Sequence, residues 1–349
     1  MSMFLLALLL YDECLFTIFY MISKILLLDT SVATLNIGDE IIIDSIRKNF
    51  SELFDSNYIY SLPTHTLQFS LIQKILYSKK MKVYSNADLK FLCGTNALYT
   101  NMLRPLPGWN INVFNLSLVK NTLCLGVGTG INSTSVNWYT RYLYSKVLSK
   151  KYIHSVRDED AKFFLEKLGF RAYNTGCPTI WGLTSDLCAK ISNTKSTSVV
   201  FTLTSYQPDR IGDKAMVDIL KKNYKYLYFW PQTIGDLDYL KTLTEDLPIV
   251  VSPNLFSYDK ILDTEIDYVG NRLHGGIRAL QHAKRTIIIS IDYRADNMSK
   301  NYNLPIIKRK NILEELDNKI NSKWETKIEG IDFDLIKKWK SQFFPKNNF

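Results

Sequence analysis

The feature that most constrains the fold is a recurring order of short aliphatic runs, loops and helical stretches. Residues 25–28 form a continuous apolar run bounded by Asp29, as in a strand buried on both faces of a parallel sheet. In the following stretch, 41–50, apolar residues recur at the spacing of one helical face. A strand, a loop and a helix in this order predict an α/β unit.

The same unit recurs along the chain. A chain of 349 residues is long enough for two α/β domains. Glycine at position 169 is predicted to end a helix over 158–168. The sequence therefore predicts an α/β chain of two Rossmann-like domains that face each other across a cleft, with parallel sheets flanked by helices. Strands are expected at 58–60, 89–93, 122–127, 152–156, 198–203, 226–230, 249–252, 266–269 and 286–291, and further helices at 213–223 and 258–262.

The chain divides into four parts. The predicted domains span 21–190 and 191–325, and the polar stretch 185–197 is the expected link. Residues 326–349 form a C-terminal helix and tail, in which 333–344 has one apolar face and is expected to pack across the domain boundary. Residues 1–20 are interpreted as an apolar N-terminal extension outside the folded core.

The N-terminal extension lacks the marks of a targeting or spanning segment. No basic residue precedes its apolar stretches, so a signal peptide is not predicted. Asp12 and Glu13 interrupt the apolar run, and each would cost about 2.5–3.5 kcal/mol at a bilayer centre. The alternative is that residues 1–20 attach the protein peripherally to a membrane.

Charge and cysteine content narrow the class of partner. The chain has 43 Lys and Arg against 34 Asp and Glu, which favours an anionic small molecule, nucleic acid or an anionic membrane. No nucleic-acid-binding motif is present, so no nucleic-acid partner is expected. The five cysteines form no CxxC pair and no Cys/His ligand spacing. They predict reduced, mostly buried thiols in the cytoplasm, with neither a metal site nor a disulfide framework.

The most informative stretch follows the predicted strand at 266–269. Arg272 and His274 come after Gly270, and Gly275 and Gly276 let the backbone approach a ligand before the next helix. An arginine fork and a helix N-terminus bind a carboxylate or phosphate, and a nearby imidazole can exchange a proton with the bound molecule. The sequence predicts an anion site in which Arg272 and His274 are catalytic.

A second arginine occupies the same position in the first domain. Arg157 follows the predicted strand at 152–156 and precedes a helix. Arginines from both domains could clamp a molecule that carries a carboxylate and a phosphate. The alternative is a salt bridge between the domains.

Weaker motifs end other predicted strands. The segment 126–130 has the sequence Gly-Val-Gly-Thr-Gly but lacks the lysine of a phosphate loop, so a tight strand-to-helix turn that lines the cleft is predicted. Cys93-Gly94-Thr95-Asn96 ends a strand in the same way. Cys177 has no histidine adjacent in sequence and is interpreted as a buried thiol. The other histidines, His65, His154 and His282, are interpreted as structural or solvent-facing.

Three of these segments occur together in a characteristic order. The loop 36–40 (Asn-Ile-Gly-Asp-Glu), the turn 155–158 (Ser-Val-Arg-Asp) and the turn 272–275 (Arg-Leu-His-Gly) resemble the signature set of the polysaccharide pyruvyl transferase family. The resemblance implies a GT-B-like arrangement of the domains and phosphoenolpyruvate as co-substrate, without a cofactor or metal. It implies that Arg157 and Arg272 hold the carboxylate and the phosphate and that His274 is the general acid or base. The substrate-binding residues implied in the same way are Asn36, Gly38, Asp39, Gly94, Thr95, Asn96, Gly128, Gly275, Gly276 and Arg294.

The chain departs from the family pattern at three places. Many members have a glycine run at 94–96, an Asp-Pro at 177–178, where this chain has Cys-Pro, and a lysine near Arg294. Arg294 could replace the charge of that lysine, although the two side chains differ in geometry.

The expected function is transfer of a pyruvyl group from phosphoenolpyruvate to sugar hydroxyls, forming a ketal in exopolysaccharide, capsule or cell-wall glycan biosynthesis. The expected partners are phosphoenolpyruvate and a sugar or lipid-linked oligosaccharide, in the cytoplasm or at the inner face of its membrane. The alternative is a GT-B glycosyltransferase that uses a nucleotide sugar, for which only Asp236 and Glu265 are candidate ribose-binding acids. A non-catalytic glycan-binding protein would leave Arg272 and His274 without a role.

Overall fold

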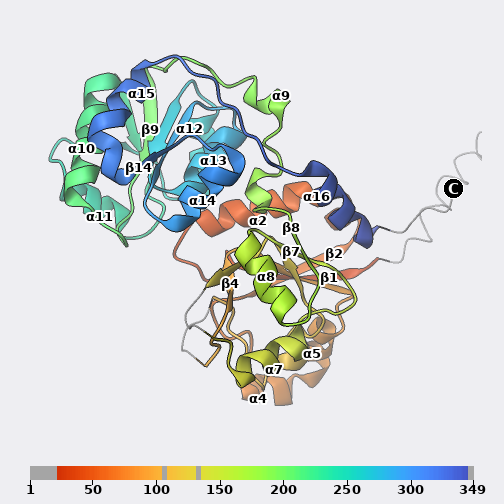
Figure 1. Ribbon diagram of the computed structural model, residues 1–349. Coiled ribbons are helices and arrows are strands. Elements are labelled where there is room, and N and C mark those ends of the chain that lie inside the picture. The colour runs from red at the N-terminus through yellow and green to blue at the C-terminus, as the bar shows by residue number, and fades with distance from the viewer. Residues whose placement is uncertain (1–21, 104–107, 131–134, 345–349) are drawn as a thin grey trace, which may run out of the picture.

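The computed structural model describes residues 22–103, 108–130 and 135–344, except for the side chain of Arg294, and has two α/β lobes (Figure 1). The first lobe contains a parallel sheet in the order β2-β1-β3-β5. A parallel bridge between Val127 and Val156 continues the layer towards β7 and β8. The strands are β1 Lys24–Asp29, β2 Tyr58–Pro63, β3 Leu89–Cys93, β5 Leu123–Leu125, β7 His154–Val156 and β8 Ala172–Asn174.

Two central strands of this domain bend at glycines instead of leading directly into helices. Gly94 and Gly126 both have φ of 64°, a conformation that favours glycine. The chain continues as β4 Asn96–Tyr99 and β6 Gly128–Gly130, which pair with each other. The predicted strand-to-helix turn at 126–130 was therefore wrong, because the glycine redirects the strand without ending the pairing.

Helices surround the first sheet and are bounded by local signals. The Asp158 side chain accepts a hydrogen bond from the backbone N–H of Ala161 and caps α8. Gly169, with φ of 84°, follows the end of α8 as predicted. The helices are α2 Gly38–Asn49, α3 Ser51–Phe54, α4 Leu71–Leu76, α5 Ser78–Ser85, α6 Leu116–Val119, α7 Trp138–Val147, α8 Glu159–Lys167 and α9 Ser185–Cys188.

The second lobe is a six-stranded parallel sheet in the order β11-β10-β9-β12-β13-β14. Numbered from its own first strand, this is the doubly wound order 3-2-1-4-5-6, in which ligands bind where the strand order reverses, here between β9 and β12. The strands are β9 Ser198–Thr202, β10 Tyr226–Phe229, β11 Ile249–Val250, β12 Asp267–Gly270, β13 Thr286–Ser290 and β14 Ile306–Lys308. The helices are α10 Arg210–Asn223, α11 Asp236–Lys241, α12 Leu255–Leu262, α13 Leu273–Gln281, α14 Tyr293–Tyr302 and α15 Asp317–Asn321.

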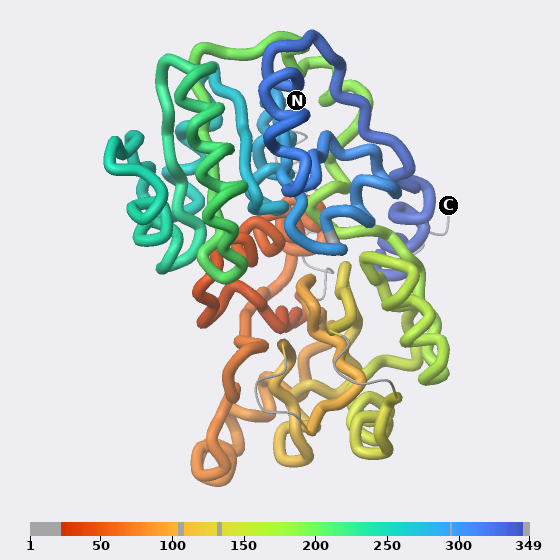
Figure 2. Tube along the Cα trace, turned by 60° about the vertical axis from the view of Figure 1, so that its left-hand side comes forward, coloured from red at the N-terminus to blue at the C-terminus, as the bar shows by residue number. Residues whose placement is uncertain are grey.

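The two domains meet along α2 and α13. Arg278 of α13 donates to Asp44 of α2 at 2.6 Å, and Gln281 donates to the Thr179 carbonyl at 2.6 Å. The chain then returns from the second domain to the first, as the dark blue segment of Figure 2 shows. There α16, Phe333–Lys340, packs in the core and Trp339 donates to the Ile153 carbonyl at 2.6 Å. The C-terminal helix therefore packs against the first domain, although it follows the second domain in the chain.

The cysteines agree with the expectation of buried thiols. Each cysteine in the described residues is buried and unbridged: Cys93, Cys124, Cys177 and Cys188. Within the same residues, no helix combines the length and apolar character needed to cross a bilayer. The extension 1–20 lies outside the described residues.

Candidate active site

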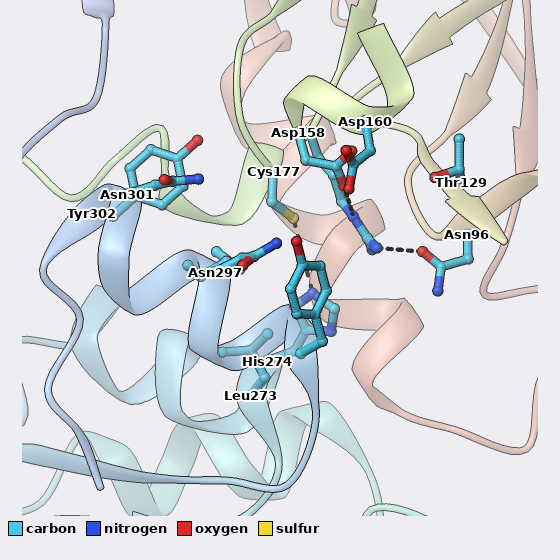
Figure 3. Close-up of a pocket in the computed structure, with 13 residues that line it drawn as sticks. Asn96, Thr129, Asp158, Asp160, Cys177, Leu273, His274, Asn297, Asn301 and Tyr302 are labelled. Atoms are coloured by element: carbon cyan, nitrogen blue, oxygen red, sulfur yellow. Dashed lines mark hydrogen bonds and ion pairs between the residues drawn. The ribbon is translucent and has the colours of Figure 1, made fainter. Parts of the chain in front are cut away.

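A cavity of about 210 Å³ lies where strand ends of the first domain meet α13 and α14 of the second. Figure 3 shows Asn96 and Thr129 on one side of it and Asn297, Asn301 and Tyr302 on the other. The cavity is smaller than the roughly 300–1,000 Å³ of sites for drug-sized ligands, which favours a small metabolite. Its lining comprises Asn96, Thr129, Arg157, Asp158, Asp160, Cys177, Leu273, His274, Tyr293, Asn297, Met298, Asn301 and Tyr302.

Arg157 is held at the edge of this cavity by the first domain. Its side chain is 14% exposed, its Nη2 donates to Asn96 Oδ1, and its Nε lies 3.3 Å from Asp158 Oδ2. A Cβ on Gly128 would lie 2.4 Å from Arg157 Nε, so only glycine leaves room for this conformation. The guanidinium is thereby oriented before a ligand arrives, as an anion-binding group requires.

His274 reaches the same cavity from the second domain. It is the second residue of α13, directly after the end of β12, and is partly buried. Its Nε2 lies 3.9 Å from Cys177 Sγ. The structure thus brings together Arg157 and His274, two of the three predicted catalytic residues. The predicted loop position of His274 and of the two following glycines was wrong, because α13 already begins at Leu273 and includes them.

Arg272 has a different environment, because its guanidinium is buried within the second domain. Its Nη2 donates to the two carboxylate oxygens of Asp236 at 2.5 and 2.6 Å, and its Nε donates to the Leu203 carbonyl at 2.9 Å. Burial alone would raise the pKa of Asp236, but the charge and hydrogen bonds of Arg272 outweigh it and hold that pKa below its usual range. Arg272 does not line the cavity, so the expected clamp of two arginines is not formed.

The ion pair with Arg272 also decides whether Asp236, the candidate ribose-binding acid, is available to a ligand. Asp236 is fully buried and accepts hydrogen bonds from the backbone N–H groups of Gln232 and Thr233 and from the Ser205 hydroxyl. Together with the ion pair to Arg272, these bonds give both carboxylate oxygens partners within the domain. It does not offer oxygens to a nucleotide in this structure.

The predicted residues of the 36–40 loop lie at the domain junction. Asn36 Oδ1 accepts from Gln232 Nε2 at 2.8 Å and from the Gly38 N–H at 3.1 Å. Asp39 accepts from the Thr34 hydroxyl at 2.6 Å. Asn36 thus joins the two domains, and none of these residues lines the cavity.

The predicted glycines serve mainly backbone packing. Gly94 and Thr95 form the bend before β4, both with positive φ. A Cβ on Gly276 would lie 2.5 Å from Ile288 Cγ1, so this glycine lets α13 pack against β13. The Gly275 carbonyl accepts from the Tyr258 hydroxyl at 2.8 Å. The side chain of Arg294 lies outside the described residues.

Sequence reasoning missed the contribution of α14. Tyr293, Asn297 and Asn301 are spaced by four residues and therefore lie on one helical face, which lines the cavity. This four-residue spacing was the sequence signal that could have identified the face of α14. Cys177 is buried, as predicted, and the fold brings His274 to it from 97 positions away.

The other three histidines make local contacts outside the cavity, as expected of structural or solvent-facing side chains. His154 is fully buried, with Nδ1 accepting from the Cys124 N–H at 3.0 Å and Nε2 lying 2.9 Å from the Ser149 carbonyl. His65 contacts the Thr30 carbonyl and His282 contacts Asp263. In the described residues, no group of three or more His, Cys, Asp or Glu side chains could hold a metal ion.

Two Rossmann-like domains with a shared cavity at their junction define an α/β protein of the GT-B-like class. The sequence model of the family described as "Polysaccharide pyruvyl transferase" matches residues 36–293, which is most of the chain. The chain belongs to the polysaccharide pyruvyl transferase family. No curated protein matches its sequence.

Solved structures support the same architecture at low sequence identity. UDP-GlcNAc 2-epimerase of Methanocaldococcus jannaschii, solved with UDP-GlcNAc and UDP, aligns with a TM-score of 0.51 and 11% identity over 92% of this chain and 99% of that chain. MnaA of S. aureus, solved with UDP, gives a TM-score of 0.52 and 9% identity over 92% of this chain and 97% of that one. These likenesses establish the fold, and the predicted GT-B-like architecture is confirmed.

Proposed function

We propose that the protein transfers a pyruvyl group from phosphoenolpyruvate to sugar hydroxyls of a polysaccharide or its precursor, in the biosynthesis of an exopolysaccharide, capsule or cell-wall glycan. The observation that carries the proposal is the shared cavity of Arg157 and His274, which come from different domains. Membership of the family makes this chemistry the first candidate. The small volume of the cavity suits a three-carbon donor.

Arg157 and His274 would have different roles toward phosphoenolpyruvate. The Arg157 guanidinium would hold an anionic group of phosphoenolpyruvate, with charged hydrogen bonds worth about 1.5–3 kcal/mol each. His274 would give a proton to the methylene carbon, which makes carbon 2 electrophilic. A sugar hydroxyl would then add at carbon 2, and phosphate would leave with the bond between carbon 2 and its oxygen.

The second hydroxyl would complete the ketal by adding at the same carbon. Two hydroxyl protons are released over the two additions. One restores the proton given by His274, and the other leaves with phosphate or solvent. Asp158 and Asp160 line the cavity and could accept a hydroxyl proton.

The acceptor sugar would lie against α14. Asn297 and Asn301 carry amides that can donate to and accept from hydroxyl groups. Tyr293 lines the cavity and is 68% exposed, so its ring could stack on a sugar face.

A nucleotide-sugar glycosyltransferase is the rival, because the similar structures named above were solved with UDP or a UDP sugar. Against this reading, Asp236 is paired with Arg272. Isothermal titration with phosphoenolpyruvate and with a panel of nucleotide sugars would separate the two functions. Binding of a nucleotide sugar alone would reject the proposal.

The direct test is phosphate release from phosphoenolpyruvate with candidate glycan intermediates. We expect Arg157→Ala to lower kcat/KM about 10- to 100-fold, and His274→Ala to lower kcat about 10²- to 10⁴-fold. Arg210→Ala, which removes an exposed arginine that bonds the Thr242 carbonyl, is the matched control. Parent-like rates in both site variants would remove the assignment.

We also propose that the enzyme works in the cytoplasm, at the inner face of the membrane. Exposed lysines line a hollow of about 540 Å³ at the edge where β3 and β5 begin: Lys120, Lys146, Lys150 and Lys151. β1 begins at this same edge. A basic surface contributes about 1 kcal/mol per lysine on anionic lipid.

Sedimentation with vesicles tests the membrane proposal. The full chain should sediment with vesicles that contain anionic phosphatidylserine and less with neutral phosphatidylcholine vesicles. Replacing the four lysines by glutamine should abolish the difference between the two vesicle types. Equal sedimentation of the parent with both would reject the proposal.

A further inference from the structure

The cavity contains a thiol that the proposed reaction leaves without a role. Cys177 follows β8, is 3% exposed and directly precedes the short 3-10 helix Pro178–Ile180. Its Sγ lies 3.9 Å from His274 Nε2 and accepts from the Thr179 hydroxyl at 3.1 Å. Figure 3 shows Cys177 and His274 on neighbouring elements of the two domains, with the sulfur directed towards the imidazole.

The thiol can contact the imidazole in either protonation state. The Thr179 hydroxyl donates to Sγ from within the same turn. The S–H can donate to the imidazole nitrogen that it faces when the ring is neutral, and the sulfur can accept from that ring N–H when the ring is protonated.

We infer that Cys177 is a positioning residue for His274, which orients the imidazole across the domain junction. The inference rests on the proposed function, because it assigns a partner to the proposed general acid. A thiol orients the ring without adding a formal negative charge. A carboxylate at the same position would stabilise the imidazolium instead.

The other cysteines in the described residues do not share this setting. Burial raises the pKa of the Cys93, Cys124 and Cys188 thiols, and these side chains do not line the cavity. Cys188 is 6% exposed, close to the exposure of Cys177. Cys188→Ala is therefore a matched control for loss of a buried thiol away from His274.

The experiment compares Cys177→Ala, Cys177→Ser and Cys177→Asp. If the thiol positions the general acid, Cys177→Ala should lower kcat about tenfold or more with little change in KM for phosphoenolpyruvate. Cys177→Ser retains an O–H donor and should keep most of the activity. Cys177→Asp should move the alkaline limb of the pH–rate profile to higher pH, and Cys188→Ala should match the parent.

A second readout does not depend on the substrate. The chain has four histidines, so His274→Ala identifies the ring signal of His274 in an NMR titration. Cys177→Asp should raise the midpoint of that titration. An unchanged midpoint overturns the inference, whether or not phosphoenolpyruvate is the donor. A raised midpoint in a protein that releases no phosphate supports the pair and rejects the proposed donor.

Discussion

Arg157 and Arg272 each follow a buried parallel strand and precede a helix, but only Arg157 lines the cavity. At the end of β7, Arg157 lines the cavity and its Nη2 contacts the neutral amide of Asn96. At the end of β12, Arg272 turns into its own domain and its charge is cancelled by Asp236. The strand–Arg–helix pattern places an arginine at a sheet edge, but the group opposite it decides whether its charge is available to a ligand.

The partners explain the difference in electrostatic terms. An amide oxygen orients a guanidinium and leaves its positive charge in place. A buried carboxylate orients it equally well and neutralises it. Asp158 also forms an ion pair with Arg157, at 3.3 Å, and its other oxygen caps α8. The Arg157 side chain is nevertheless 14% exposed and lines the cavity, whereas Arg272 is 3% exposed and bonded within its own domain.

Arg272→Ala should destabilise the protein strongly. It leaves the Asp236 carboxylate buried without its ion pair, which typically costs about 3–5 kcal/mol. Urea denaturation should show that loss in the free energy of unfolding, while Arg157→Ala should change it by less than about 1 kcal/mol. Equal losses in the two variants would mean that the arginines are structurally equivalent.

A second prediction concerns β7, the strand that ends at Arg157. Burial lowers the pKa of His154 from 6.5 to about 4, although its bond to the Ser149 carbonyl acts in the opposite direction. Between these values the unfolded chain binds a proton that the folded protein does not, so stability rises with pH and is lost as pH falls. The shift corresponds to about 3 kcal/mol across this window.

His154→Gln tests this linkage. The variant is expected to be less stable at neutral pH, because it disturbs the bonds to Cys124 and Ser149. Its stability should depend less on pH across the same window. Denaturation at several pH values measures the slope, and a slope equal to that of the parent would exclude His154 as its source.

Local patterns were sufficient for most of the fold. The predicted strands 25–28 and 286–291 correspond to β1 and β13, in which residues 25–29 and 286–290 are buried, because a strand covered on both faces is largely apolar. Short strands such as β8 and β14 were missed, since each has only three residues and is recognised as a strand by its pairing with another strand.

The site was predictable only where a side chain follows directly from its strand end. Arg157 and His274 reach the cavity because β7 and β12 end there. Asp236, in contrast, lies 36 positions from Arg272, and no local pattern relates the two. Long-range pairs of this kind determine which predicted residues face the ligand.

Gly128→Ala should displace the Arg157 guanidinium without removing any charge. The new Cβ would lie 2.4 Å from Arg157 Nε, and the flexible arginine side chain can move away more easily than the β6 backbone. Stability should therefore change little, whereas kcat/KM for phosphoenolpyruvate should fall about tenfold, roughly 1.4 kcal/mol. Gly182→Ala is the matched control, because a Cβ there meets no atom within 4 Å. A parent-like kcat/KM in Gly128→Ala would show that the observed orientation of Arg157 is not the one that binds the donor.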